Sequence, residues 1–264
     1  SLMDYLLANS PRDMVETVIS GIKKSDVEVS HIVSLADFIA SAYPYYTDPM
    51  PNLYFTRDPG ACLADGLNVH HMSTKARRRE ALLLKYMYKH NKDFAPEGTN
   101  LWYDYHQDYS IEGGDVLVLS KDIVGIGLSE RTTACGIERF AENLLTHSTF
   151  KKILVFDIPK TRAFMHLDTV FTMVDYDKFT IHPEIEGPLQ IYAITLGPDQ
   201  KVRFESLQDG LQHILSTELK LPSVELIRCG GDDPIAAQRE QWNDGSNTLA
   251  IAPGVVITYE RNYV

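Results

Sequence analysis

Cysteine is scarce in this 264-residue chain, and no long hydrophobic run occurs in it. The three cysteines, Cys62, Cys135 and Cys229, stand far apart, and no two of them form a CxxC pair. An odd number of widely spaced thiols gives no disulfide framework and no cysteine-rich zinc site, so we expect a reducing compartment, the cytoplasm. No apolar stretch approaches the roughly 20 residues that a membrane-spanning helix needs.

Basic side chains are also in deficit. The 25 lysine and arginine residues face 36 aspartate and glutamate residues, which gives a formal net charge of −11. Such an excess repels phosphate backbones and anionic lipid, so we expect no nucleic-acid partner and no membrane partner. With 44% hydrophobic and 23% charged residues, the composition is that of a globular protein.

One local pattern occurs four times along the chain. It consists of an apolar strand, a short polar or glycine-containing turn, and a second apolar strand. The turns follow one another at intervals of roughly 55 to 77 residues, which indicates a repeat architecture. The predicted strand pairs are 52–56 with 66–71, 116–119 with 123–128, 170–174 with 179–182, and 249–252 with 255–259.

Helical patterns, usually followed by a further strand, lie between these hairpins. A unit of hairpin, helix and strand repeated around an axis predicts an α/β propeller. The helices are predicted at 74–91, 132–145, 207–219 and 233–242, with an earlier one at 14–24, and the extra strands at 152–156 and 224–228.

Chargeable residues stand at or just before the first strand of each predicted hairpin. Equivalent positions of a quasi-symmetric array face the same axis, so we expect these groups to converge. Several carboxylates and a histidine in one cleft repel one another unless a cation, either a metal or a substrate, lies between them. The groups are Asp58 in the first repeat, Glu112 and Asp115 in the second, His166 and Asp168 in the third, and residues 243–247 in the fourth.

Each candidate also has a structural interpretation. Asp58 precedes a proline and could be a turn former. The glycines after Glu112 allow the backbone to approach either a ligand or a neighbouring segment. His166 and Asp168 alternate along a predicted strand and should face the same side. The remaining histidines, His70, His71, His182 and His213 among them, are interpreted as structural or exposed.

Five motifs occur in order along the chain. They are Asn52-Leu-Tyr-Phe-Thr-Arg-Asp58, Glu112-Gly-Gly-Asp115, Ser129-Glu-Arg-Thr132, His166-Leu-Asp-Thr169 and Trp242-Asn-Asp-Gly-Ser-Asn247. Together they resemble the arginine deiminase family, within the guanidino-group-modifying (pentein) superfamily of five-bladed α/β propellers. The resemblance implies that residues 48–264 form an incomplete catalytic propeller of the α/β class and that residues 1–47 are the remnant of a helical insertion with its linker.

The resemblance implies a role for each matching residue. Asp58 and Asp168 would bind the substrate guanidinium, and His166 would be the general acid and base. Glu112 would support this histidine and the guanidinium, and Asp115 would hold the catalytic residues in place without contacting the substrate. Arg77 and Arg131 would bind the substrate α-carboxylate, and Asn52 and Phe55 would line the pocket.

The implied reaction hydrolyses L-arginine to L-citrulline and ammonia, with no metal or organic cofactor. A cysteine thiolate attacks the guanidinium carbon, His166 protonates the leaving ammonia, and the same histidine then activates water. In this family the nucleophilic cysteine lies near the C-terminus, and none of the three cysteines here matches its motif. We therefore expect this chain alone to be inactive.

Other functions remain compatible with the sequence. A related guanidino-modifying enzyme, an amidinotransferase or a dimethylarginine hydrolase, would use the same groups. A binding fragment without chemistry would explain the missing nucleophile, and a metal hydrolase could use His166, Asp168 and Asp58. The open strand edges of an incomplete propeller favour association, so we also expect a homo-oligomer.

Overall fold

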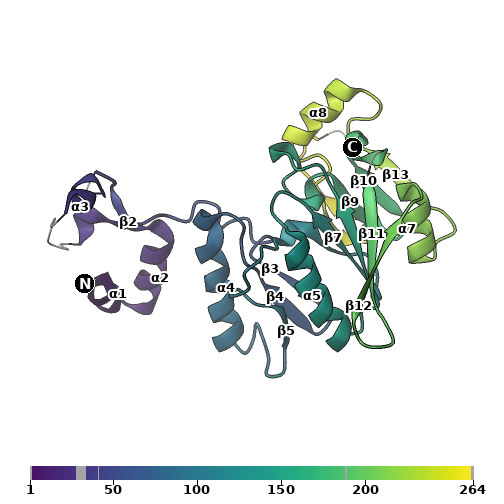
Figure 1. Cartoon of the computed structure of the whole chain (residues 1–264). Helices are drawn as coiled ribbons and strands as arrows, with labels where there is room; N and C mark the ends of the chain where they lie inside the picture. Colours follow the sequence, from purple (N-terminus) through teal and green to yellow (C-terminus); the bar gives the residue numbers. More distant parts are fainter. Residues whose placement is uncertain (1, 28–33, 41, 188, 263–264) are drawn as a thin grey trace.

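A unit of hairpin, helix and strand occurs three times in the computed structural model (Figure 1). The model describes residues 2–27, 34–40, 42–187 and 189–262. The first unit comprises β3 (Gly60–Leu63), β4 (Gly66–Val69), α4 (Arg78–His90) and β5 (Asn100–Tyr103). The second comprises β6 (Val116–Val118), β7 (Ile123–Leu128), α5 (Ala134–His147) and β8 (Lys152–Asp157). The third comprises β9 (Phe171–Asp175), β10 (Lys178–Ile181), α7 (Leu211–Leu219) and β13 (Glu225–Arg228).

Strand pairing is the same in all three units. The two hairpin strands are antiparallel, and the third strand runs parallel to the second one, as in the pairs β4–β5, β7–β8 and β10–β13. A fourth hairpin, β14 (Leu249–Ala252) with β15 (Val255–Ile257), lies against β9. The predicted repeat is thus confirmed, whereas the arrangement of the units as blades of an incomplete propeller stays a prediction.

The second sheet is wider than the sequence predicts. An additional hairpin, β11 (Gln190–Leu196) with β12 (Val202–Leu207), joins it through antiparallel pairing of β11 with β8, giving the order β12-β11-β8-β7-β6. The predicted start of a helix at residue 207 is wrong, because Leu207 ends β12 and α7 begins at Leu211.

The expected first strand, residues 52–56, is also wrong. The amide of Leu53 donates to the carbonyl of Met50 and that of Phe55 to the carbonyl of Asn52, so the segment forms turns. The strand that pairs with β4 is β3, and the turns carry the chain directly to Arg57 and Asp58.

The predicted alternation of His166 and Asp168 along a strand is wrong as well. Asp168 lies within the 3₁₀ turn η5 (Leu167–Thr169), His166 directly precedes this turn, and β9 begins only after it.

The N-terminal part contains α1 (Leu2–Leu7), α2 (Pro11–Ser20) and α3 (Leu35–Ala40), with a short pair of strands, β1 (Ile22–Lys23) and β2 (Tyr45–Thr47). These purple elements lie at one end of the molecule in Figure 1, beyond α4. Helix α2 starts three residues before its predicted start, because Ser10 caps the amide of Asp13 and Pro11 occupies the first turn. It ends before Gly21, whose φ is 83°.

The remaining helices are short. These helices are α6 (Pro183–Glu186), α8 (Pro234–Trp242) and the 3₁₀ turns η1 (Lys24–Asp26), η2 (Lys75–Arg77), η3 (Gly113–Asp115), η4 (Arg162–Phe164) and η5. None of the helices within the described ranges combines the length and the apolar character needed to cross a bilayer.

Strand β8 separates the two largest apolar clusters. Successive side chains of a strand point to opposite faces of its sheet. Ile153 and Val155 accordingly pack with the apolar face of α5, and Leu154 and Phe156 pack with the third unit and α7. This burial on both faces explains why β8 is almost continuously apolar.

We predict that Phe171→Ala strongly destabilises the protein. Phe171 is fully buried, with ring centroids 5.2 Å from Phe156 and 5.1 Å from Phe179. Truncation of such a side chain costs about 3–5 kcal/mol of unfolding free energy, measured by urea denaturation. The matched control is Phe204→Ala on the exposed strand β12, which should change stability by about 0.5 kcal/mol or less. Equal losses would contradict the assignment of the core.

Candidate active site

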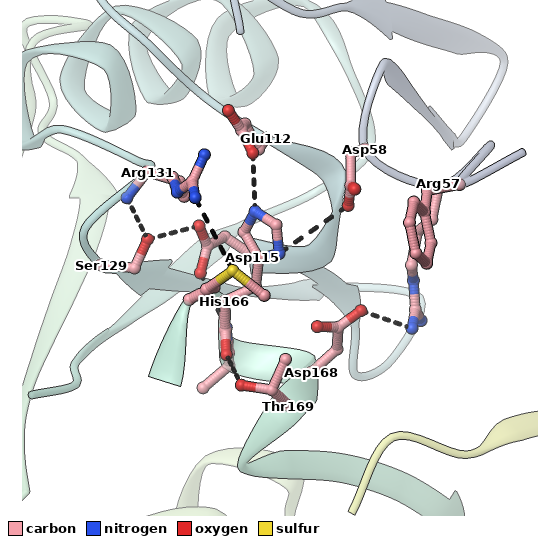
Figure 2. Close-up of polar contacts among 12 residues, drawn as sticks. Arg57, Asp58, Glu112, Asp115, Ser129, Arg131, His166, Asp168 and Thr169 are labelled. Atoms are coloured by element: carbon pink, nitrogen blue, oxygen red, sulfur yellow. Dashed lines mark hydrogen bonds and ion pairs between the residues drawn. The ribbon is translucent and has the colours of Figure 1, made fainter. Parts of the chain in front are cut away.

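The chain segments that lead into the three hairpins bring four chargeable side chains together (Figure 2). Asp58 precedes β3, Glu112 precedes η3 and β6, and His166 and Asp168 flank the start of η5 before β9. Nε2 of His166 lies 2.8 Å from Oε2 of Glu112, and its Nδ1 lies 3.9 Å from Oδ1 of Asp58. The predicted convergence is therefore confirmed for the first three repeats. Residues 243–247 of the fourth form no hydrogen bond with these four side chains in the described part of the chain, and the carbonyl of Ser246 accepts from Oγ1 of Thr180 instead.

Glu112 is fixed from two directions. Its Oε1 accepts a hydrogen bond from the amide of Ser73 at 2.8 Å, while Oε2 faces His166. Its own amide donates to Oγ1 of Thr132 at 3.1 Å. Since the carboxyl group is completely buried, these partners determine where it can point.

Gly113 and Gly114 permit a close approach of neighbouring protein segments. A Cβ atom at Gly113 would lie 1.9 Å from the carbonyl oxygen of Arg57, and one at Gly114 would lie 2.7 Å from the imidazole of His166. A larger residue would therefore push the second hairpin entrance away from the first, if placed at Gly113, or from the third, if placed at Gly114. Of the two interpretations left open by the sequence, the structure supports the approach of a neighbouring segment.

The surrounding carboxylates change the proton affinity of His166. Burial alone would lower its pKa, but the hydrogen bond with Glu112 and the charges of Asp115, Asp58 and Asp168 outweigh burial and raise the pKa to about 9. The imidazole is therefore protonated at neutral pH. A positively charged histidine among carboxylates can donate a proton to a leaving group.

Asp168 is a buried carboxyl group with one free oxygen. Its Oδ2 accepts a hydrogen bond from Nη1 of Arg57 at 2.9 Å, whereas Oδ1 is buried and has no partner among the described residues. Burial and the nearby Asp58 raise the pKa of Asp168 to about 6, although Arg57 and His166 act in the opposite direction. The free oxygen leaves an acceptor for a further donor.

Asp115 connects the second repeat with the third. Its Oδ1 accepts from the amide of Leu167 at 2.8 Å, and its Oδ2 accepts from Oγ of Ser129 at 2.7 Å. Burial raises the pKa of Asp115 to about 7, although the charge of His166 and the hydrogen bonds that Asp115 accepts act in the opposite direction. Because Leu167 stands between His166 and Asp168, this carboxyl group fixes the backbone that carries both.

Arg77 lies against protein carboxylates. Nη1 donates to Oδ2 of Asp58 at 2.6 Å, and Nη2 donates to Oε2 of Glu80 at 2.8 Å and to the carbonyl of Phe55 at 3.4 Å. The carbonyl of Asn52 is also within reach, and the guanidinium carbon lies 5.8 Å from the ring centroid of Phe55. The predicted contact of Arg77 with a substrate carboxylate stays a prediction.

Arg131 has donors left for a ligand. Its amide donates to Oγ of Ser129, and its Nη2 contacts Sδ of Met165 at 3.7 Å. Its Nε has no partner among the described residues. Figure 2 shows this side chain beside the acid–histidine cluster formed by Asp58, Glu112, His166 and Asp168. The predicted contact of Arg131 with a substrate carboxylate stays a prediction.

His70 is a residue of this site that the sequence did not single out. It is completely buried, and its Nδ1 lies 2.9 Å from the carbonyl oxygen of Asp58. Burial lowers its pKa to about 4, against the carbonyl of Asp58 and the charges of Glu112 and Asp58, so the ring is neutral at pH 7. A neutral Nδ1–H donor holds the backbone that carries Asp58. The signal available in the sequence was its place at the end of β4.

The three cysteines lie outside this cluster. Cys62 and Cys135 are exposed, and Cys229 is buried near Gly245 and Ser246. None of them forms a hydrogen bond with the acid–histidine cluster in the part of the chain that is described. The described residues also contain no group of three or more histidine, cysteine, aspartate or glutamate side chains arranged for a metal ion, so the metal-hydrolase alternative gains no geometric support.

Solved structures with a similar fold define the class of protein. The complex of AgrE with L-arginine matches 78% of this chain and 25% of its own, with a TM-score of 0.52 and 18% identity. The substrate-bound N-terminal domain of ArgZ, a cyanobacterial arginine dihydrolase, matches 82% and 66%, with a TM-score of 0.51 and 16% identity. This likeness shows that the chain shares the α/β fold with mixed sheets of these structures.

Sequence comparison identifies the family within that class. The arginine deiminase family model matches residues 2–264. The arginine deiminases of Bacillus thuringiensis subsp. konkukian (strain 97-27) and Limosilactobacillus reuteri (strain DSM 20016) are 49% and 47% identical over all of this chain. The chain belongs to the arginine deiminase family. It spans 65% of the length of each of these curated relatives.

We predict that Glu112→Gln lowers the pKa of His166 by roughly 1 to 3 pH units, since it removes the hydrogen-bonded negative charge. NMR titration of the imidazole should give a pKa of about 9 in the unaltered chain. Because this value exceeds the ordinary 6.5, the stability that the charge contributes is complete below about pH 6.5 and is lost as the pH rises through about 9. The control is Glu142→Gln on the exposed face of α5. An unchanged titration in the first variant would contradict the pairing.

We predict that Arg77→Ala lowers the free energy of unfolding by about 3–5 kcal/mol, because it leaves two buried carboxylates without their cation. Arg77→Lys should lose less, since it keeps the charge without the planar array of donors. Arg139→Ala is the control: that arginine pairs with Glu142 on the surface of α5, and its removal should cost about 0.5 kcal/mol or less. Urea unfolding that ranked Arg139→Ala with Arg77→Ala would refute a structural role for Arg77.

Proposed function

We propose that this chain carries most of the site of an enzyme that hydrolyses L-arginine to L-citrulline and ammonia. The observation that carries the proposal is the pair of carboxyl groups, Asp58 and Asp168, beside a protonated His166. A guanidinium stays charged at every working pH and presents five donors in a plane, which suits paired carboxylates. Membership of the arginine deiminase family supports the same substrate.

The residue roles follow from charge and position. Asp58 and Asp168 bind the substrate guanidinium, and Glu112 keeps His166 protonated and correctly oriented. Arg131, with its unpartnered Nε, binds the α-carboxylate, for which arginine is the bidentate partner. Asn52, Phe55 and Arg77 form the wall of the pocket next to Asp58, and Arg77 holds that carboxylate in place.

The reaction proceeds in two halves. A cysteine thiolate attacks the guanidinium carbon, the C–N bond breaks, and the proton on His166 goes to the departing ammonia. The resulting thiouronium is then attacked by water, whose proton returns to His166, and citrulline leaves as the C–S bond breaks. Since none of the three cysteines belongs to the cluster, the thiol comes from outside these 264 residues, and the chain alone is inactive.

The wider arrangement is part of the proposal. Residues 48–264 form the catalytic unit, with its repeats arranged as an incomplete propeller, and residues 1–47 belong to a helical insertion. The complete protein works in the cytoplasm, where free thiols persist, and needs no metal or organic cofactor. The exposed apolar side chains of β14 and β15, such as Leu249 and Ile251, favour self-association.

We predict that a chimera completed with the remaining segments of the B. thuringiensis relative forms citrulline from L-arginine, while the 264-residue chain alone does not. His166→Ala in the chimera should lower the rate by roughly 10²- to 10⁴-fold, because the acid and base of both halves is removed. His213→Ala, at an exposed position of α7, is the matched control. A colorimetric citrulline assay measures each protein.

Two results would overturn the proposal. One is citrulline formation by the 264-residue chain itself, which would place the nucleophile among its own residues. The other is a folded chimera that is inactive on arginine but active on dimethylarginine, or that transfers the amidino group to an amine. Either activity would assign the site to another guanidino-modifying enzyme.

A further inference from the structure

Arg57 and Asp168 form an ion pair whose two members differ in exposure. Nη1 of Arg57 lies 2.9 Å from Oδ2 of Asp168, and the arginine side chain is 41% exposed while that of the aspartate is 4% exposed. Asp168 is held within η5, where its carbonyl accepts a hydrogen bond from Oγ1 of Thr172. One partner is therefore fixed, and the other extends from a turn at the surface (Figure 2).

The neighbouring pair of Arg77 with Asp58 is different. Its two side chains are only 10% and 11% exposed, and Arg77 also binds Glu80 and two backbone carbonyls. The side chain of Arg57 has only the single contact with Asp168 among the described residues. Of the two guanidinium groups that form ion pairs with aspartates of the cluster, Arg57 is thus the one that can leave without breaking other interactions found among the described residues.

The Asp168 carboxyl group is incompletely used by Arg57. Oδ2 accepts from Nη1, while Oδ1 is buried and receives no donor within the described ranges. A guanidinium that entered the cluster in the plane of the carboxylate could donate to both oxygens. Supplying a donor to a buried, unpartnered oxygen is favourable, so such a ligand gains a contact that Arg57 does not make.

We propose that Arg57 is an internal competitor for substrate: its guanidinium occupies Asp168 in the ligand-free site and must move away before a substrate guanidinium binds. This inference rests on the proposed function, because it assumes that Asp168 receives the substrate. Arg57 then sets the affinity of the site, since the apparent dissociation constant equals the intrinsic one divided by the fraction of molecules in which Asp168 is free. The unpartnered Oδ1 of Asp168 also favours guanidinium over ammonium ligands, because a planar guanidinium presents two parallel N–H donors to both carboxylate oxygens, whereas an ammonium acts as a point charge.

The test measures binding of L-arginine to the 264-residue chain and to its Arg57→Gln variant by isothermal titration calorimetry. We expect the variant to bind about five- to tenfold more tightly, as the competing cation is removed. The titration is run at pH 8, because loss of Arg57 removes an influence that lowers the pKa of Asp168 and the carboxyl group must stay ionised. The matched control is Arg203→Gln, whose exposed pair with Asp199 has the same 2.9 Å separation.

A second readout follows Arg57 itself. In the unaltered chain, the side-chain ¹⁵N signals of Arg57 should shift when L-arginine is added and should stay in place when L-lysine is added at the same concentration. Signals that do not respond to bound L-arginine would show that Arg57 keeps its position, which overturns the competition.

The calorimetric outcomes separate the two hypotheses. Equal or weaker binding by Arg57→Gln, with clear binding by the unaltered chain, overturns the role of Arg57 and leaves the proposed substrate intact. Binding by the variant alone supports the competition in its strongest form. If neither folded protein binds L-arginine, release of Asp168 has not opened a guanidinium site, and both the competition and the proposed substrate fail.

Discussion

The burial of four carboxyl groups around one imidazole is the constraint on which the rest of the site depends. Asp58, Glu112, Asp115 and Asp168 are each less than a tenth exposed, and an unpaired charge at such a position is expensive. Each has received a partner that the fold supplies: Arg77 for Asp58, the Ser73 amide and His166 for Glu112, the Leu167 amide and Ser129 for Asp115, and Arg57 for Asp168. The high pKa of His166 follows from this crowding of negative charge.

The repeated unit explains how residues from distant parts of the chain meet. In each unit the functional side chain stands just before the first hairpin strand, so it occupies the same place relative to its own sheet. The units are then joined at those places by specific contacts, such as that of Gly114 with His166 and that of Asp115 with Leu167. A carboxylate and a histidine more than 50 residues apart in sequence thereby lie within hydrogen-bond distance.

The periodicity of the hydrophobic residues predicted much of the fold, but it could not predict which residues far apart in the sequence contact one another. The hairpin of β6 and β7 and the helix α5 match their predictions closely, because alternation and helical spacing are local signals. The residues at 52–56 are apolar and suggested a strand, but their place is fixed by turns beside Arg77. Arg57 and Asp168 are 111 residues apart in the sequence, so no local pattern predicted their ion pair. No local pattern predicted the contact of His70 with the backbone of Asp58 either.

The two arginines that pair with Asp58 and Asp168 show how the chain meets the electrostatic requirement of its buried carboxylates. An unpaired carboxylate at such a position is costly, so protein guanidinium groups face them. Arg77 is buried with Glu80, whereas Arg57 is held by one contact among the described residues and reaches solvent. If Asp58 and Asp168 bind a substrate guanidinium, as we propose, Asp58 is the fixed end of that position, and Asp168, with its unpartnered Oδ1, is the end that opens. The protein would then stabilise its buried acidic site with the same chemical group as its substrate.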